Sequence, residues 1–186
     1  DLNEDGKVDV KDREILMRNY NRKNTTVEWT PPKTEEEIFN FAFPLVLSKG
    51  QTYTVTSPYG MRKHPTTGIE SKHTGIDLRS DWHIGILAAQ EGEVVFAGDN
   101  GAFGNAVEIK HVINGEEIYT FYAHLSRIDV KVGDKVQRGQ QIGLEGGDAS
   151  DDNPGQSTGH HLHFEVRTKS GYGNDVDPTL YINFKQ

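Results

Sequence analysis

Three short segments of the chain alternate polar and apolar residues with the period of a β-strand. They cover residues 73–78, 119–125 and 161–166, and each contains histidine. Successive side chains of a strand point to opposite faces, so residues two or four apart share a face. His73 and Asp77 would then share one face, as would His161 and His163. The apolar residues expected to turn into a core are Ile76, Leu78, Leu162, Phe164 and Val166.

Further β-rich stretches predict more strands between these segments. Asn114-Gly115 separates two of them and is a strong signal for a two-residue hairpin turn. Twenty glycines and few helix-length periodic segments favour a turn-rich antiparallel domain. We therefore expect a mainly β fold, an antiparallel and turn-rich domain, over residues 41–186. The expected strands cover residues 52–56, 93–97, 106–110, 118–125, 130–136 and 141–144.

Residues 1–24 form a separate unit whose polar pattern matches an EF-hand calcium loop. Oxygen ligands occupy loop positions 1, 3, 5, 9 and 12, Gly6 permits the sharp turn, and position 7 offers a backbone carbonyl. Residues 12–20 are predicted to form a short amphipathic helix, which completes an EF-hand-like loop-helix. The expected calcium ligands are Asp1, Asn3, Asp5, Lys7, Asp9 and Asp12.

The aspartate at the last loop position departs from the standard EF-hand and resembles a dockerin repeat. Dockerins contain two such repeats, and one is visible here. The segment could be a dockerin-like half that binds a cohesin-type partner, a local calcium clip, a leftover of a longer module or a chance acidic turn. A single repeat favours the clip or the leftover. Residues 25–40 form a polar linker, with Pro31-Pro32 excluding regular structure.

The composition of the chain narrows the chemistry that it can carry. Its 20 Lys and Arg residues against 28 Asp and Glu give a formal charge of -8, which argues against a nucleic-acid-binding module. There is no cysteine, so a transition-metal site must use histidine and carboxylate ligands. No apolar run approaches the length of a membrane span. Because the sequence begins with Asp1, we expect any targeting signal to have been removed or to lie outside it.

The alternating segments can assemble imidazoles and a carboxylate into a zinc site. Zinc in hydrolases takes three protein ligands and leaves a position for water, whose proton is lost near neutral pH. His73, Asp77 and His163 would supply two nitrogens and one oxygen. His161 and His124 would lie beside the metal as free imidazoles, suited to acid–base chemistry. The alternative, ordinary surface histidines on half-exposed strands, is disfavoured because all four share the face that opposes the apolar residues.

Other polar residues near these positions receive different predictions. His160 has the opposite parity from its neighbours and is expected in a turn beside the site. Glu165 shares the face of His163 and could reach the metal, orient a ligand or form a salt bridge. Three histidines without a partner at ligand spacing are expected to be solvated surface residues: His64, His83 and His111.

The motifs around these residues resemble those of the lysostaphin- and LytM-type zinc endopeptidases. SPYGMR at 57–62 and HTGIDL at 73–78 are similar to the first signature of that family. YAHLS at 122–126 and STGHHLHFE at 157–165 are similar to the second and third, and the glycine-containing stretches at 132–136 and 139–143 match its connecting strands. The resemblance covers roughly residues 41 to 182, and its motifs are specific in combination.

The resemblance implies an enzyme, secreted and extracellular or associated with the cell wall, that cleaves peptide bonds of bacterial peptidoglycan in the stem peptide or its cross-bridge. By its pattern His73, Asp77 and His163 bind zinc, His161 is the general base, and His124 positions or stabilises the reacting groups. The resemblance also implies a twisted antiparallel β-sheet, with the site in a groove walled by loops. Because every ligand and both histidines are present, the pattern argues against the alternative, a non-catalytic wall-binding or amidase-activator module of the same fold.

Two further features concern substrate recognition. Arg62 is a candidate substrate contact, since a guanidinium suits carboxylates on a stem peptide, and a salt bridge is the alternative role. The loop at 146–157 looks longer and more acidic than is usual in the family. It could wall the groove and affect substrate choice, or be a plain solvated loop. Asn105 matches a family turn and is expected to be structural.

Overall fold

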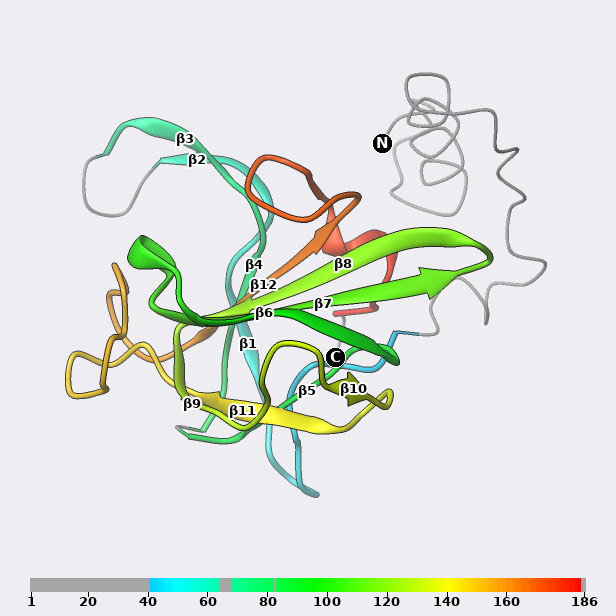
Figure 1. Ribbon diagram of the computed structural model, residues 1–186. Helices are drawn as coiled ribbons and strands as arrows, with labels where there is room; N and C mark the ends of the chain where they lie inside the picture. The colour runs from blue at the N-terminus through cyan, green and yellow to red at the C-terminus, as the bar shows by residue number, and fades with distance from the viewer. Residues whose placement is uncertain (1–40, 64–67, 82, 185–186) are drawn as a thin grey trace.

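The computed structural model describes residues 41–63, 68–81 and 83–184. Within these ranges the chain consists of β-strands and two short 3-10 turns, with no α-helix (Figure 1). No helix in this part of the chain is long and apolar enough to cross a membrane. The predictions of a calcium loop, a cohesin-type partner and a linker, and that for His64, concern residues outside the described ranges and stay predictions.

The strands of the described residues are antiparallel, as the sequence predicted, but they form three sheets where one was expected (Figure 1). The central sheet has eight strands. Along the sheet these are β1 (Thr54–Ser57), β4 (Ile76–Arg79), β12 (Leu162–Arg167), β8 (Glu116–Ala123), β7 (Asn105–Ile113), β6 (Gly92–Asp99) and β10 (Lys135–Val136), with β13 (Asp175–Val176) paired to β12. A three-stranded sheet contains β5 (Gly85–Leu87), β11 (Gln141–Glu145) and β9 (Leu125–Ile128). The hairpin β2 (Gly60–Lys63) and β3 (Glu70–His73) is the third sheet, and the 3-10 turns are η1 (Gly101–Phe103) and η2 (Pro178–Leu180).

The predicted hairpin turn lies between β7 and β8. Asn114 and Gly115 both have positive φ, 54° and 82°, and Ile113 pairs with Glu116 across the turn. Two consecutive residues of positive φ are what a type I′ turn requires, and its twist matches that of the flanking strands. By contrast, the strand predicted at 130–136 is reduced to Lys135 and Val136, because a turn at Gly133 (φ 90°) occupies the preceding residues.

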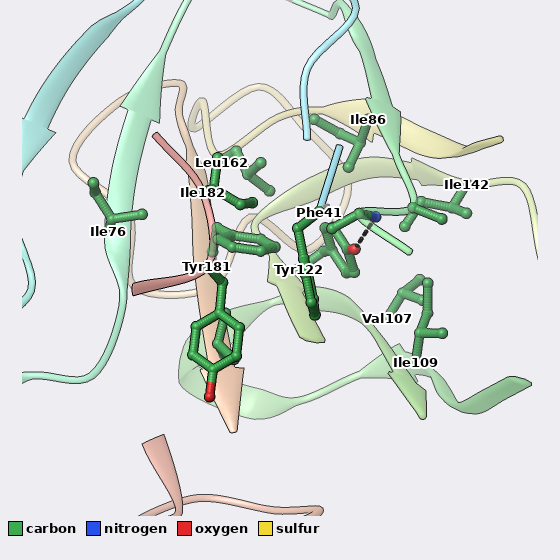
Figure 2. Close-up of a cluster of buried hydrophobic side chains, with 14 of the residues drawn as sticks. Phe41, Ile76, Ile86, Val107, Ile109, Tyr122, Ile142, Leu162, Tyr181 and Ile182 are labelled. Atoms are coloured by element: carbon green, nitrogen blue, oxygen red, sulfur yellow. Dashed lines mark hydrogen bonds between the residues drawn. The ribbon is translucent and has the colours of Figure 1, made fainter. Parts of the chain in front are cut away.

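The alternation within two of the three opening segments correctly predicted the core. Ile76, Leu78, Leu162, Phe164 and Val166 are all buried. Figure 2 shows Ile76 and Leu162 of the central sheet in one apolar cluster with Ile86 and Ile142 of the three-stranded sheet. Each such side chain contributes on the order of 1.5–3 kcal/mol when fully buried. The core therefore joins the two larger sheets and holds β4 and β12 in the register on which the site depends.

His111 is a buried residue, and its predicted place on the solvated surface was wrong. Its ring is fully buried, with Nδ1 2.7 Å from the Glu91 carbonyl oxygen and Nε2 2.7 Å from Thr120 Oγ1. It lies on β7 two and four residues after Ile109 and Val107, which are core residues, so the period of the strand places it on the core face. The hydrogen bonds satisfy both ring nitrogens and make this burial tolerable.

This buried histidine predicts a loss of stability in acid. Burial lowers the pKa of His111 to about 4, from 6.5. The folded state therefore resists protonation: the full stability is present above about pH 6.5 and is lost as the pH falls towards 4. The corresponding cost is about 3 kcal/mol. Urea unfolding of His111→Gln should show a fall in unfolding free energy from pH 7 to pH 4.5 that is about 2 kcal/mol smaller than in the unsubstituted protein. Val112→Gln, at the exposed neighbour, is the control; equal falls in all three proteins would contradict the prediction.

Candidate active site

Three ligand atoms converge where the hairpin β2–β3 meets the central sheet. His73 Nε2 lies 3.1 Å from Asp77 Oδ1 and 3.1 Å from His163 Nδ1, and the last two atoms are 2.9 Å apart. Ligands bound tetrahedrally at zinc distances of about 2.0–2.2 Å lie roughly 3.3–3.6 Å from one another, slightly farther apart than these atoms. The triangle is therefore close to the size that a zinc ion needs, and the three buried residues form a potential metal-binding group. The donor set of two imidazoles and a carboxylate also suits zinc.

The chain brings these ligands together from two different sheets. Asp77 and His163 are direct partners in the register of β4 and β12. His73, however, ends β3, so residues 73–78 are not one strand as predicted: Thr74 and Gly75 separate β3 from β4. A Cβ at Gly75 would lie 2.4 Å from the Phe164 carbonyl oxygen and 2.9 Å from His163 Cε1. Only glycine lets the chain cross β12 this closely and return His73 to the face of Asp77.

The electrostatics of the group favour an ionised carboxylate beside the two imidazoles. Burial opposes ionisation of Asp77, but hydrogen bonds from His163 and His73 outweigh it and hold the pKa of Asp77 well below its usual range. Burial likewise opposes protonation of His163, yet Asp77 and Glu165 on its two sides raise the pKa of His163 to about 9. Because a zinc ligand must be a neutral imidazole, metal binding here is coupled to the release of a proton.

His161 and His124 lie together beside the metal-binding group. His161 Nε2 is 3.7 Å from Asp77 Oδ1, and the two imidazole centroids are 4.7 Å apart. The Nδ1 atoms lie 2.8 Å from backbone carbonyl oxygens, those of Gly159 and Pro154. A carbonyl oxygen can only accept a hydrogen bond, so the Nδ1 atom facing it must carry a proton. Each neutral ring then has a free lone pair on Nε2.

Both of these imidazoles resist a second proton. Burial, and then the neighbouring rings of His161 and His163, lower the pKa of His124 to about 3. Burial also lowers the pKa of His161, against the attraction of Asp77. The two rings are therefore neutral near pH 7 and able to accept a proton, which is the state that a general base requires.

His124 lies at the site as predicted, but its backbone conformation places it there and not the alternation of a regular strand. On β8 the site face carries Phe121 and Ala123, which pair with Glu165 and His163, whereas Tyr122 faces the core. A regular strand would have placed His124 on the same side as Tyr122. Instead β8 ends at Ala123, and His124 adopts a positive φ of 59°, which redirects its side chain. Such a conformation costs a non-glycine residue on the order of 1–3 kcal/mol.

A cleft of about 420 Å³ opens above these five residues. One side is the hairpin β2–β3, which contributes Arg62, and another is the η1 turn with Phe103. The loop at 146–157 takes part in the wall: Gln156 lines the cleft, and the Pro154 carbonyl fixes His124. Asn105, which was predicted to be structural, holds this loop through a hydrogen bond: its Nδ2 donates to the Asp152 carbonyl oxygen at 3.0 Å. Thr158 and Tyr172 complete this part of the wall.

The other polar residues that the sequence singled out do not line the cleft. His160 does not line it, and its Nε2 lies 3.1 Å from the Ser80 carbonyl oxygen. His83 is exposed as expected, but it pairs with Asp151 at 2.9 Å, a partner distant in sequence. Glu165 accepts from the far nitrogen of His163 at 2.8 Å and pairs with Arg167, so of its three predicted roles the salt bridge is the one observed. Five further residues at or near the site were not predicted from the sequence: Thr74, Glu108, Arg167, Phe103 and Tyr172. Only Arg167 could have been found from the pattern, because it lies four residues after His163 and so shares its face of the strand.

An antiparallel β domain that holds a His–Asp–His triad and two free imidazoles in one cleft has the construction of a metallopeptidase. Residues 71–178 match the model of peptidase family M23, and the chain belongs to this family. It is 38% identical over 137 residues to the DD-carboxypeptidase/endopeptidase Mpg of Neisseria meningitidis serogroup B, covering 74% of this chain and 28% of that protein. It is also 40% identical over 105 residues to the peptidoglycan DD-endopeptidase ShyA of Vibrio cholerae, covering 56% of this chain and 22% of that protein. The chain thus spans between a fifth and a third of the length of these curated relatives.

Solved structures share the fold. A zinc-containing peptidase from Vibrio cholerae has a TM-score of 0.59 at 33% identity, covering 74% of this chain and 39% of that one. The catalytic domain of lysostaphin from Staphylococcus simulans has a TM-score of 0.57 at 29% identity, covering 70% of this chain and 91% of that one. The matched part of this chain therefore corresponds to nearly the whole length of that lysostaphin domain.

Proposed function

We propose that this domain is a zinc-dependent endopeptidase that hydrolyses peptide bonds of bacterial peptidoglycan, in the stem peptide or its cross-bridge. The observation that carries the proposal is the complete set of polar groups in one cleft: His73, Asp77 and His163 around a zinc-sized triangle, with His161 and His124 beside them. The relatives named as peptidoglycan DD-endopeptidases support the substrate class. Since that substrate lies outside the cytoplasm, the proposal includes a secreted or wall-associated location.

The mechanism assigns different work to the two groups of residues. The zinc would be held by His73 Nε2, Asp77 Oδ1 and His163 Nδ1. When bound, it would supply Lewis acidity and lower the pKa of water so that a hydroxide nucleophile is available near neutral pH. His161 Nε2, neutral and 3.7 Å from Asp77 Oδ1, accepts a proton from the attacking water as general base. The His124 ring lies beside that of His161 and is held through Nδ1 by the Pro154 carbonyl oxygen. Its role is to position or stabilise the reacting groups.

The test is digestion of purified cell walls that differ in cross-bridge chemistry, followed by mass analysis of the released fragments. Zinc-loaded protein should release fragments with new amino termini, a chelator should stop the release, and added zinc should restore it. The masses identify the bond that is cut. If the folded, zinc-loaded protein binds walls but releases nothing from any of them, the non-catalytic wall-binding or activator module is the correct interpretation instead.

Arg62 is proposed to contact a carboxylate of the substrate. Its side chain is 28% exposed on the cleft wall, with Nη2 3.9 Å from Asp77 Oδ2, too long for a hydrogen bond. Its Nε is buried without a hydrogen-bond partner in the described part of the chain. The partly exposed Nη2 group, which makes no hydrogen bond with Asp77, is therefore the donor available for a ligand, next to the carboxylate that would hold the metal.

Arg62→Gln should lower kcat/KM about 10- to 100-fold, mainly through KM, because a charge-assisted hydrogen bond contributes about 1.5–3 kcal/mol. Lys63→Gln removes the same charge from the exposed neighbouring residue of β2 and should change kcat/KM less than about twofold. Substrates with amidated and free carboxylates, assayed with each protein, identify the contact. An equal loss on both substrates would contradict a carboxylate contact.

A further inference from the structure

A row of buried charged side chains runs along β12 away from the metal-binding group. His163, Glu165 and Arg167 alternate on this strand and so share one face of the central sheet, and their side chains are 5%, 1% and 4% exposed. Glu165 Oε1 lies 2.8 Å from His163 Nε2, and Arg167 Nε donates to Glu165 Oε2 at 2.6 Å. The row thus begins at a proposed metal ligand and continues into the protein.

Glu165 fixes which nitrogen of His163 faces the metal. A carboxylate accepts and does not donate, so Glu165 keeps a proton on His163 Nε2. Once the proton on Nδ1 is released on metal binding, the lone pair of Nδ1 would be the one directed to the space beside His73 and Asp77. Thr74 Oγ1 donates to the same carboxylate oxygen at 2.6 Å and holds it in place. Metal-binding histidines generally need such a partner to set the tautomer and the orientation of the ring.

Arg167 in turn fixes Glu165. Its guanidinium stacks 3.9 Å above the ring of Phe121, and its Nη1 donates to Glu108 Oε1 on β7 at 2.7 Å. The planar guanidinium is therefore held between two buried carboxylates and an aromatic face, and it can move only if all three contacts change. An isolated buried carboxylate would be costly, and Arg167 is the partner that stabilises Glu165 on the side opposite His163.

Glu108 connects the same row to the wall of the cleft. Its Oε2 accepts from Ser170 Oγ at 2.5 Å, and its Oε1 accepts from the Gly171 amide at 3.2 Å. The next residue, Tyr172, lines the cleft. The contacts that orient the metal ligand and those that hold this part of the wall therefore meet at one carboxylate.

We propose that Glu165 is a positioning residue for the metal site, and that Arg167 and Glu108 hold it in the orientation that makes His163 Nδ1 a ligand. This inference rests on the proposed zinc site but does not require that the domain cleave peptidoglycan. It assigns a role in metal affinity to two residues, Arg167 and Glu108, that do not belong to the metal-binding group.

The test is the zinc affinity of purified protein, measured by competition with a chromophoric chelator. Glu165→Gln should lower the affinity about 10- to 100-fold, and Glu165→Leu should lower it further, because the amide oxygen restores an acceptor and leucine does not. Arg167→Lys keeps the charge, loses the planar fork and should lower the affinity about tenfold. Glu93→Gln makes the same change in an exposed carboxylate paired with Lys135 and should leave the affinity unchanged.

Two accompanying measurements separate positioning from folding. Thermal melting of the metal-free variants shows which of them are folded, and Arg167→Lys keeps the test decisive if Glu165→Leu is not. The visible spectrum of the cobalt-substituted protein reports ligand geometry and should change in Glu165→Gln but not in Glu93→Gln. Folded Glu165→Gln and Arg167→Lys with the unsubstituted affinity and spectrum would overturn the inference. Protein that binds zinc and loses affinity in these variants, yet releases nothing from walls, would support the inference and refute the proposed function.

Discussion

Replacing His163 with alanine is expected to abolish both zinc binding and the release of peptide from peptidoglycan. The substitution removes the ligand that lies 2.9 Å from Asp77 and 3.1 Å from His73, and two remaining ligands do not make a zinc site of this type. The Lewis acid contributes several kcal/mol of transition-state stabilisation, so kcat/KM should fall about 1,000-fold or more. The measurements are zinc content per chain and the rate of fragment release.

Chelation of the unsubstituted protein provides the matched comparison. It should reproduce the loss of activity, and added zinc should restore the unsubstituted protein but not His163→Ala. Because the substitution also leaves Glu165 without its imidazole partner, circular dichroism must show that the variant is folded. Activity close to that of the unsubstituted protein in folded, zinc-free His163→Ala would refute a metal-dependent reaction at this site.

Alanine substitution is expected to lower kcat/KM strongly at His161 and to leave it nearly unchanged at the adjacent His160. His161→Ala should keep its zinc and lose kcat/KM about 100- to 10,000-fold, because the loss of a general base removes a proton acceptor without removing a ligand. His160→Ala should retain activity within about twofold, since its Nε2 contacts the Ser80 carbonyl and it does not line the cleft. Zinc content and rates of fragment release for both variants check this pair. An equal loss in the two, or zinc loss in His161→Ala, would show that the roles have been wrongly assigned.

Strand periodicity predicted the central part of the site because it is built from regular strands. Asp77 and His163 face each other across paired strands, with Ile76 and Leu162 turned to the core, as alternation requires. The same rule could have placed Arg167 beside Glu165. It could not have revealed Glu108, because that contact depends on β8 lying between β12 and β7 in the sheet order.

The failures of the sequence reasoning have identifiable physical causes. His124 was predicted at the site through strand parity, yet it lies there because the chain takes a positive φ that a sequence pattern does not encode for histidine. His73 belongs to a separate hairpin, since the close crossing at Gly75 interrupts what looked like one strand. The lack of a partner at metal-ligand spacing predicts a surface position for His111, whereas its parity with the core residue Ile109 indicates the burial that is observed.

The separate hairpin has a mechanical consequence. His73 and Arg62 lie on the two-stranded sheet, whereas Asp77 and His163 belong to the central sheet, and Lys72 pairs with Asp175 across the same junction. An ion held by all three ligands would therefore link the hairpin to the central sheet at a further point, besides the two places where the chain itself joins them, Pro58–Tyr59 and Thr74–Gly75. Since Arg62 lies on the same hairpin as His73, the alignment of a substrate with the reacting groups would depend on that link, and the ion would set the shape of the cleft as well as its chemistry.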